Sequence, residues 1–148
     1  MSRRGRKLLE KFDEVFLMTL GVARTAFNEV GRDVGMTGPQ MNALMSLQRF
    51  ENGVTMRELS EMQMLSHGAT TGLVDRMINM DLLERTRSET DRRVVYVCLS
   101  KKGREVFERI TERRAEALTP ILDQLDKGAE ESVLKALTIL EDQFKRLN

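Results

Sequence analysis

A cluster of arginine and lysine side chains is the feature of this chain best suited to chemistry, because such side chains bind polyanions. Residues 85–104 carry seven basic and two acidic residues, a net charge of +5. The whole chain of 148 residues has a formal net charge of only +1, because residues 8–84 and 105–148 are acidic. A basic segment inside an acidic chain favours a polyanionic partner there. A solvated basic hairpin is the alternative that charge leaves open.

Residues that usually carry catalysis or bind metals are scarce. His67 is the only histidine and Cys98 the only cysteine, whereas a zinc site needs three or four ligands. The chain has no glycine-rich phosphate loop and no cysteine–histidine pair at a plausible spacing. We therefore expect no enzyme, no metal and no other cofactor. Cys98 lies in an apolar segment, so we expect a buried side chain there rather than a redox sensor.

Length and composition predict a single soluble domain. Apolar residues make up 41% of the chain and charged residues 32%, which suits a compact folded protein. Apolar runs fall short of the roughly 18 residues that a membrane-spanning helix needs. The basic start of the chain is not followed by the apolar core of a secretory signal. We expect a cytoplasmic protein.

Hydrophobic spacing predicts a series of helices before residue 82. A long amphipathic helix runs from about Lys7 to Gly31, and a second helix begins after Thr37. Thr55 and Glu58 form a capping box that opens a short helix, and Ser66 can cap the next one. The inward row of this last helix is predicted to be Ala69 or Thr70, then Leu73, Met77 and Met80. Two short helices so joined are typical of a helix-turn-helix.

A β-hairpin and two further helices complete the predicted fold. Residues 82–87 and 93–99 favour strands separated by a polar turn. Ser100 can cap a long helix that Pro120 bends or breaks, and a last helix follows with an apolar stripe over Val133–Leu147. A hairpin placed directly after a helix-turn-helix indicates a winged helix-turn-helix. The predicted fold class is mainly α with a small β-hairpin wing (α+β), and the hairpin coincides with the basic segment.

Several motifs at these spacings resemble the multiple-antibiotic-resistance regulator (MarR) family of bacterial transcription factors. They are Leu59-Ser-Glu, Leu65-Ser66, Leu73-Val-Asp-Arg76, Leu82-Leu-Glu-Arg85, Asp91-Arg-Arg93 and Leu99-Ser-Lys-Lys-Gly103. The best match covers about residues 55–104. The resemblance implies one MarR-like domain over 1–148, with a winged helix-turn-helix at about 37–104 and dimerisation helices at about 7–33 and 105–147.

The resemblance also implies a homodimeric DNA-binding repressor or activator that responds to small molecules or oxidants; of these we expect a repressor that responds to a small molecule. In that family the helix that matches Ser66–Met80 would enter the major groove of DNA. The arginine that matches Arg93 would enter the minor groove, and the acid that matches Asp91 would orient it. Helix and guanidinium geometry suit these grooves, whereas Arg85, Arg87, Lys101 and Lys102 suit phosphates. The predicted DNA-binding residues are Ser66, His67, Gly68, Thr70, Thr71, Arg76, Arg85, Arg87, Asp91, Arg92, Arg93 and Lys101.

The predicted recognition helix departs from the family pattern at Gly68, Ala69 and Gly72, where serine, threonine and arginine are common. Glycine within a helix costs about 1 kcal/mol against alanine. Close approach of the backbone to DNA would explain this composition. A helix with few side-chain contacts, which shifts discrimination to the wing and to DNA shape, would explain it equally well.

Two terminal helices with full apolar stripes, Phe12–Phe27 and Val133–Leu147, predict a homodimer. A two-fold dimer places two recognition helices about one helical turn of DNA apart, so the operator should be a pseudo-palindromic duplex. Packing of the two stripes on each other within one chain is the alternative.

Ten methionines in the chain fit either core filling or a pliable ligand pocket. The resemblance places an effector, expected to be a small aromatic or phenolic compound, between the dimerisation helices and the winged helix. Our candidates for its lining are Phe16, Leu20, Met41, Met45 and Phe50. The alternative function is a winged-helix protein-interaction module without specific DNA readout.

Overall fold

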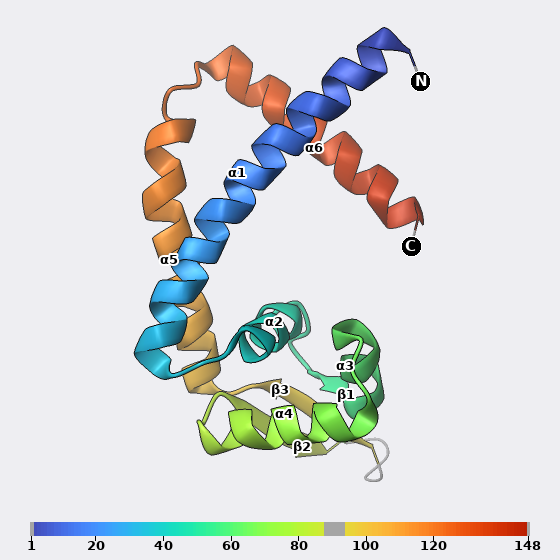
Figure 1. Cartoon of the computed structure of the whole chain (residues 1–148), viewed down its shortest axis with the longest axis vertical. Helices are drawn as coiled ribbons and strands as arrows, with labels where there is room; N and C mark the ends of the chain where they lie inside the picture. The colour runs from blue at the N-terminus through green and yellow to red at the C-terminus, as the bar shows by residue number, and fades with distance from the viewer. Residues whose placement is uncertain (1, 88–93, 148) are drawn as a thin grey trace. The chain divides into compact units, whose positions relative to one another are not determined.

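The computed structural model describes residues 2–87 and 94–147. It separates into two compact units, Met1–Arg114 and Ala115–Asn148, and each is described by itself. The single-domain organisation that the sequence suggests therefore stays a prediction. In the first unit, α3, α4 and the strands lie at the end away from the start of α1 (Figure 1).

The elements follow the order that the sequence predicts, with one addition. The helices are α1 (Arg3–Val34), α2 (Gly38–Leu47), α3 (Met56–Gln63), α4 (His67–Asn79), α5 (Lys101–Leu122) and α6 (Lys127–Leu147), and the strands are β1 (Val54–Thr55), β2 (Leu83–Arg87) and β3 (Val95–Leu99). The two-residue strand β1 was not predicted, because two residues carry no periodic signal. The winged helix-turn-helix and the mainly α fold class are confirmed.

The three strands form one antiparallel sheet in the order β1-β3-β2. Val54 pairs with Val97 across β1 and β3, and Leu83 pairs with Leu99 across β2 and β3. This register turns Leu83, Val97 and Leu99 toward the core, where all are buried. The sheet thereby attaches the wing to the helix-turn-helix through side chains as well as backbone pairing.

The core of the first unit lies beneath the helix-turn-helix. Leu44 and Leu47 of α2, Leu59 of α3 and Ile110 of α5 are almost completely buried together. Full burial of such a side chain stabilises the fold by roughly 1.5–3 kcal/mol. At the edge of this core Arg109 of α5 forms an ion pair with Asp33 of α1, with 2.8 Å between Nη2 and Oδ2.

Side-chain caps set where the short helices begin, as the sequence predicts. The Glu58 backbone N–H donates to the Thr55 hydroxyl, while the Thr55 N–H and hydroxyl donate to the Glu58 carboxylate at 2.7 and 2.8 Å. These hydrogen bonds lower the pKa of Glu58. The Ser66 hydroxyl accepts from the Ala69 N–H, which fixes the start of α4.

Pro120 lies inside α5, which ends two residues later at Leu122. The sequence predicts a bend or break at this proline. The helix does not break at the proline itself but ends shortly after it, and a bend there stays a prediction.

A close backbone contact explains why the motif Leu99-Ser-Lys-Lys ends in a glycine, Gly103. A Cβ atom at this position would overlap the carbonyl oxygen of Leu82, which itself accepts from the Ser100 N–H at 3.1 Å. The first turn of α5 therefore packs backbone against backbone on the segment that enters β2.

Gly103→Ala is expected to lower the free energy of unfolding by about 1–3 kcal/mol, because overpacking forces the backbone apart. Urea unfolding followed by circular dichroism measures the change. Gly68→Ala is the matched control, since a Cβ there meets nothing within 4 Å. Equal stability of the two variants would contradict this account of the packing.

Candidate nucleic-acid interface

The helix-turn-helix consists of α3 and α4 joined by residues 64–66. Met64 adopts a left-handed conformation with φ of 51°, and its backbone N–H donates to the Glu61 carbonyl. The Leu65 N–H donates to the Ser60 carbonyl at 3.0 Å. These bonds close α3 and turn the chain within three residues, so Ser66 lies at the start of the next helix.

The orientation of α4 against α3 depends on Thr70, which is completely buried. The Ser60 hydroxyl donates to Thr70 Oγ1 at 3.0 Å, and the Thr70 hydroxyl donates to the Ser66 carbonyl at 3.0 Å. A hydroxyl that is buried and satisfied in this way fixes a specific packing. Of the two inward candidates, Thr70 is correct, whereas Ala69 is exposed.

Burial of Thr70 corrects one predicted DNA contact. With no exposed surface and its hydroxyl turned to Ser60 and Ser66, this side chain cannot reach a base or a phosphate. The sequence pattern allowed either face, because threonine is common both in cores and at interfaces.

The outward face of α4 is opposite its buried row of Thr70, Leu73, Val74 and Met77. With 3.6 residues per turn, Gly68 and Gly72 lie on this outward side. Ser66 and His67 are exposed at the start of the helix. Thr71 is half-buried, and its hydroxyl donates to the His67 carbonyl at 2.9 Å. The backbone around Gly68, in the first part of this face, is therefore left bare by its own side chains.

An ion pair joins the recognition helix to the wing. The Arg85 guanidinium of β2 donates to the Asp75 carboxylate of α4, with 2.6 Å between Nη2 and Oδ1. Both side chains are about half exposed. Sequence reasoning singled out Arg85 as a phosphate contact but overlooked Asp75. The two lie ten positions apart on different elements, so no helical spacing signals their pairing.

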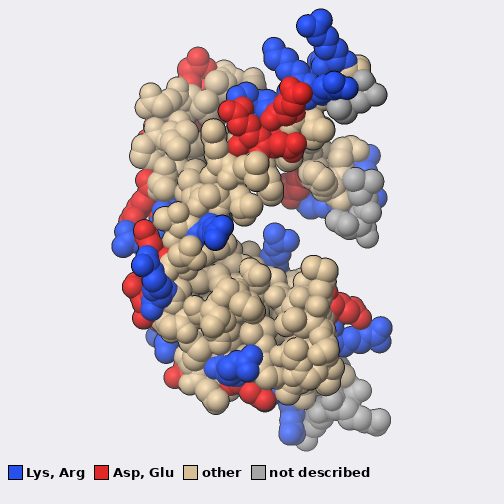
Figure 2. Space-filling model, in the orientation of Figure 1, with Lys and Arg blue, Asp and Glu red and all other residues tan. Residues whose placement is uncertain are grey.

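At the end of the first unit that carries α3, α4 and the strands, basic side chains are scattered over a mostly uncharged surface, with some acidic ones between them (Figure 2). Arg87 is exposed at the end of β2, and Lys101 is exposed at the start of α5. Lys102 donates to the Met80 carbonyl at 2.9 Å, so its charge lies at the carboxyl end of α4. The candidate residues Asp91, Arg92 and Arg93 lie outside the described residues.

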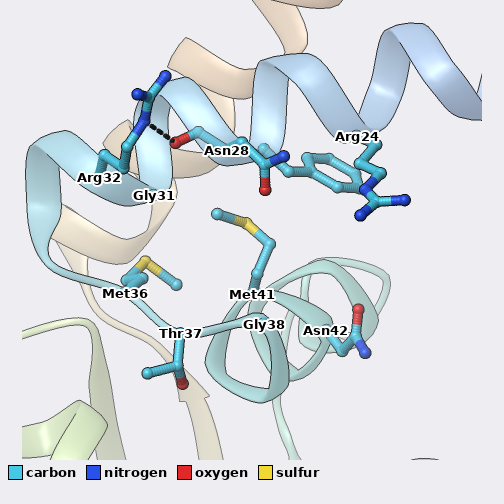
Figure 3. Close-up of a pocket in the computed structure, with 10 residues that line it drawn as sticks. Arg24, Asn28, Gly31, Arg32, Met36, Thr37, Gly38, Met41 and Asn42 are labelled. Carbon is cyan, nitrogen blue, oxygen red and sulfur yellow. Dashed lines mark hydrogen bonds between the residues drawn. The ribbon is translucent and has the colours of Figure 1, made fainter.

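A pocket of about 740 Å³ lies between α1 and α2. Its lining is Arg24, Phe27, Asn28, Gly31, Arg32, Met36, Thr37, Gly38, Met41 and Asn42. It contains two arginines, amides, apolar side chains and no acid. In Figure 3 the Arg24 guanidinium points into the space between the helices, whereas Arg32 turns back along α1, where its Nε donates to the Asn28 carbonyl.

The five candidate effector residues do not meet in this pocket. Met41 lines it, and Met45 packs against the core. Phe16 and Leu20 are exposed on α1. Phe50 lines a second pocket of about 420 Å³ beside Phe107 of α5.

Sequence reasoning overlooked the polar side of the larger pocket. Arg24, Asn28 and Arg32 recur every four residues and thus share one face of α1. This spacing was an available signal.

Cys98 is buried, as the sequence predicts. Burial and the neighbouring Glu84 carboxylate raise the pKa of its thiol. Among residues 2–87 and 94–147, no cluster of three or more histidine, cysteine, aspartate or glutamate side chains could hold a metal ion. None of the helices in these ranges is long and apolar enough to cross a membrane.

Comparison with known proteins gives a consistent family assignment. The sequence profile of the MarR family matches residues 34–94. The HTH-type transcriptional regulator YsmB of Bacillus subtilis is 30% identical over 118 residues, which cover 80% of each chain. These similarities are to transcriptional regulators, not to enzymes.

Solved structures share the fold over nearly the whole chain. A MarR family protein from Bacillus stearothermophilus superposes with a TM-score of 0.76 at 28% identity, covering 98% of this chain and 99% of that one. A variant of MepR from Staphylococcus aureus, bound to an oligodeoxyribonucleotide, gives a TM-score of 0.61 at 17% identity, covering 90% and 97%. At that identity the likeness to MepR concerns the fold only.

Proposed function

This chain belongs to the MarR family of transcriptional regulators, and we propose that it is a homodimeric repressor that binds a pseudo-palindromic operator and responds to a small aromatic acid. The observation that carries the proposal is the arrangement of α4. Its buried face fixes the helix against the core, and its exposed face lies beside exposed basic side chains. Such a regulator acts where bacterial DNA lies, in the cytoplasm. The fold shared with MepR, which was crystallised with an oligodeoxyribonucleotide, supports this use.

In this proposal α4 enters the major groove with its first residues toward the base edges. Exposed Ser66 and His67 start the helix, and its N-terminal amides favour a nearby phosphate. Arg93 enters the minor groove, whose negative potential attracts a guanidinium. Arg87 and Lys101 bind phosphates, which contribute affinity that does not depend on sequence.

Arg93→Ala is expected to lower operator affinity by about tenfold or more, because it removes a groove contact. Lys101→Ala should weaken binding to operator and random duplex alike and flatten the salt dependence by about one unit of slope. Fluorescence anisotropy over a salt series measures both effects. The parent protein should prefer its operator by about three decades or more; an equal affinity for random duplex would instead favour the protein-interaction module.

The dimer is supported by apolar side chains that α1 and α6 each expose. On α1, Phe12 and Phe16 stack with ring centroids 6.2 Å apart and remain about half exposed. On α6, Leu134, Leu137 and Phe144 are more than half exposed. Continuous apolar faces of this kind mark contact surfaces.

Leu137→Glu is expected to convert the dimer to a monomer at micromolar concentration, because it buries a charge in the interface. Light scattering coupled to size exclusion measures the mass. Lys135→Glu introduces the same residue on the same helix at an exposed charged position, and it should leave the dimer intact. If the parent protein is a monomer at this concentration, the proposed dimer is refuted and the proposal of a pseudo-palindromic operator is weakened.

The pocket between α1 and α2 supports the choice of an aromatic acid. Arg24 offers a charged partner for a carboxylate, and Phe27, Met36 and Met41 offer apolar contacts for a ring. The same α2 carries Gln40, whose Nε2 lies 3.5 Å from the Met80 sulfur at the end of α4. A ligand that moves α2 would therefore act directly on the recognition helix.

Arg24→Ala is expected to abolish the release of operator by hydroxybenzoates while leaving operator affinity unchanged. Titration of the protein–DNA complex with hydroxybenzoates, and with phenols that lack the carboxylate, measures the release. Arg49→Ala is the matched control, because Arg49 is exposed and does not line the pocket. Release of the Arg24→Ala complex at parental concentrations would refute this pocket.

A further inference from the structure

Arg76 lies in the last turn of α4 and is exposed. Its side chain bends toward the start of the helix, since a Cβ built on Gly72 would lie 3.5 Å from Arg76 Nη1. This is the usual direction for long side chains on a helix. The guanidinium therefore lies over Gly72, about one turn closer to the end of the helix that approaches base edges.

The surface beyond the guanidinium is open. A Cβ built on Gly68, the next outward position toward the start of α4, would meet nothing within 4 Å. The Thr71 hydroxyl is turned to the His67 carbonyl. No side chain at position 68 or 72 thus separates Arg76 from the floor of a major groove in which the helix lies.

The neighbouring acid is already engaged elsewhere. Asp75 holds Arg85 of β2 at 2.6 Å, and the positions 75 and 76 diverge by 100° around the helix. Within the part of the chain that the structure describes, Arg76 has no ion pair or side-chain hydrogen bond. Its planar row of donors is available to a ligand.

We propose that Arg76 is the specificity-determining residue of the recognition helix and binds a guanine in each operator half-site through O6 and N7. This proposal rests on the proposed DNA-binding function. A bidentate pair with guanine is the commonest specific contact that arginine makes in a major groove. Position 72 is glycine in this chain, and the Arg76 guanidinium covers the surface above it from one turn away.

Asp75 acts in this arrangement as a positioning residue. By neutralising Arg85 on the wing side of the helix, it keeps that guanidinium away from the groove-facing surface and avoids an uncompensated acid near DNA. Hydrogen bonds between charged groups are stronger than those between neutral groups. This ion pair links α4 to β2, the two elements that contact DNA in the proposal.

The experiment starts from a randomised duplex library, from which the parent protein selects its tightest binding sequence. Each guanine of that duplex is then replaced by 7-deazaguanine, which lacks only the N7 acceptor. We expect one guanine in each half-site at which the replacement costs the parent protein about tenfold or more in affinity. Arg76→Ala removes the donors that would bind N7 and O6, so it should lose this sensitivity.

Arg87→Ala is the matched control, because Arg87 is predicted to bind phosphate; it should keep the full 7-deazaguanine penalty. Retention of the penalty in Arg76→Ala would overturn the proposal, as would an equal loss of affinity for every duplex, which marks a phosphate contact. If the parent protein selects no sequence above random duplex, the proposed DNA-binding function fails, and the guanine assignment fails with it.

A separate experiment tests the positioning role of Asp75. Asp75→Asn should tighten binding to random duplex, because one negative charge is removed, and at the same time reduce the preference for the selected guanine. Asp81→Asn removes the same charge from an exposed position that forms no ion pair with any other described residue, and it should leave the preference unchanged. If both variants behave alike, Asp75 contributes only its charge.

Discussion

One face of α4 is almost completely buried, and it fixes the orientation of the side chains on the opposite, exposed face. The buried residues are Thr70, Leu73, Val74 and Met77. Thr70 matters most, since its hydroxyl bonds both to α3 and to the start of α4 itself. A buried polar group with satisfied bonds tolerates few alternative packings. The outward side of the helix is consequently set by contacts on its inward side.

A chain of close contacts connects that helix to its surroundings in the first unit. Lys102 of α5 donates to the carbonyl of Met80, and Gln40 of α2 reaches the sulfur of the same residue. Gly103 packs its backbone on Leu82, immediately before β2. The end of α4 is thus the point at which the pocket-bearing helix, the wing and α5 converge. In the proposed function, a ligand bound between α1 and α2 would act on the DNA-binding face through these contacts.

Tertiary contacts also distinguish the basic side chains of residues 85–104 from one another. The described basic residues of 85–104 do not form one uniform patch. Arg85 is paired with Asp75, and Lys102 donates to the carboxyl end of α4. Arg87 is exposed, and Lys101 is exposed with its ammonium 3.9 Å from the Glu105 carboxylate. In the proposed function, affinity for DNA and discrimination among sequences consequently fall to different side chains. Within α4 the proposal assigns discrimination to Arg76, because the glycines leave no competing side chains at positions 68 and 72.

The sequence by itself determined the order of helices, the wing and their starting points. Hydrophobic spacing, the Thr55–Glu58 capping box and the cap at Ser66 are local signals, and local hydrogen bonds enforce them. The family resemblance followed from the same segments, and so did most of the candidate DNA-binding residues.

Only the tertiary structure decided which side of each element meets which neighbour. It buried Thr70, paired Asp75 with Arg85, and placed the five candidate effector residues apart, with only Met41 in the pocket that Arg24 lines. The physical reason is that periodicity reports how apolar a face is, whereas pairing depends on the distance between elements that are remote in sequence. Those distances exist only once the core has packed.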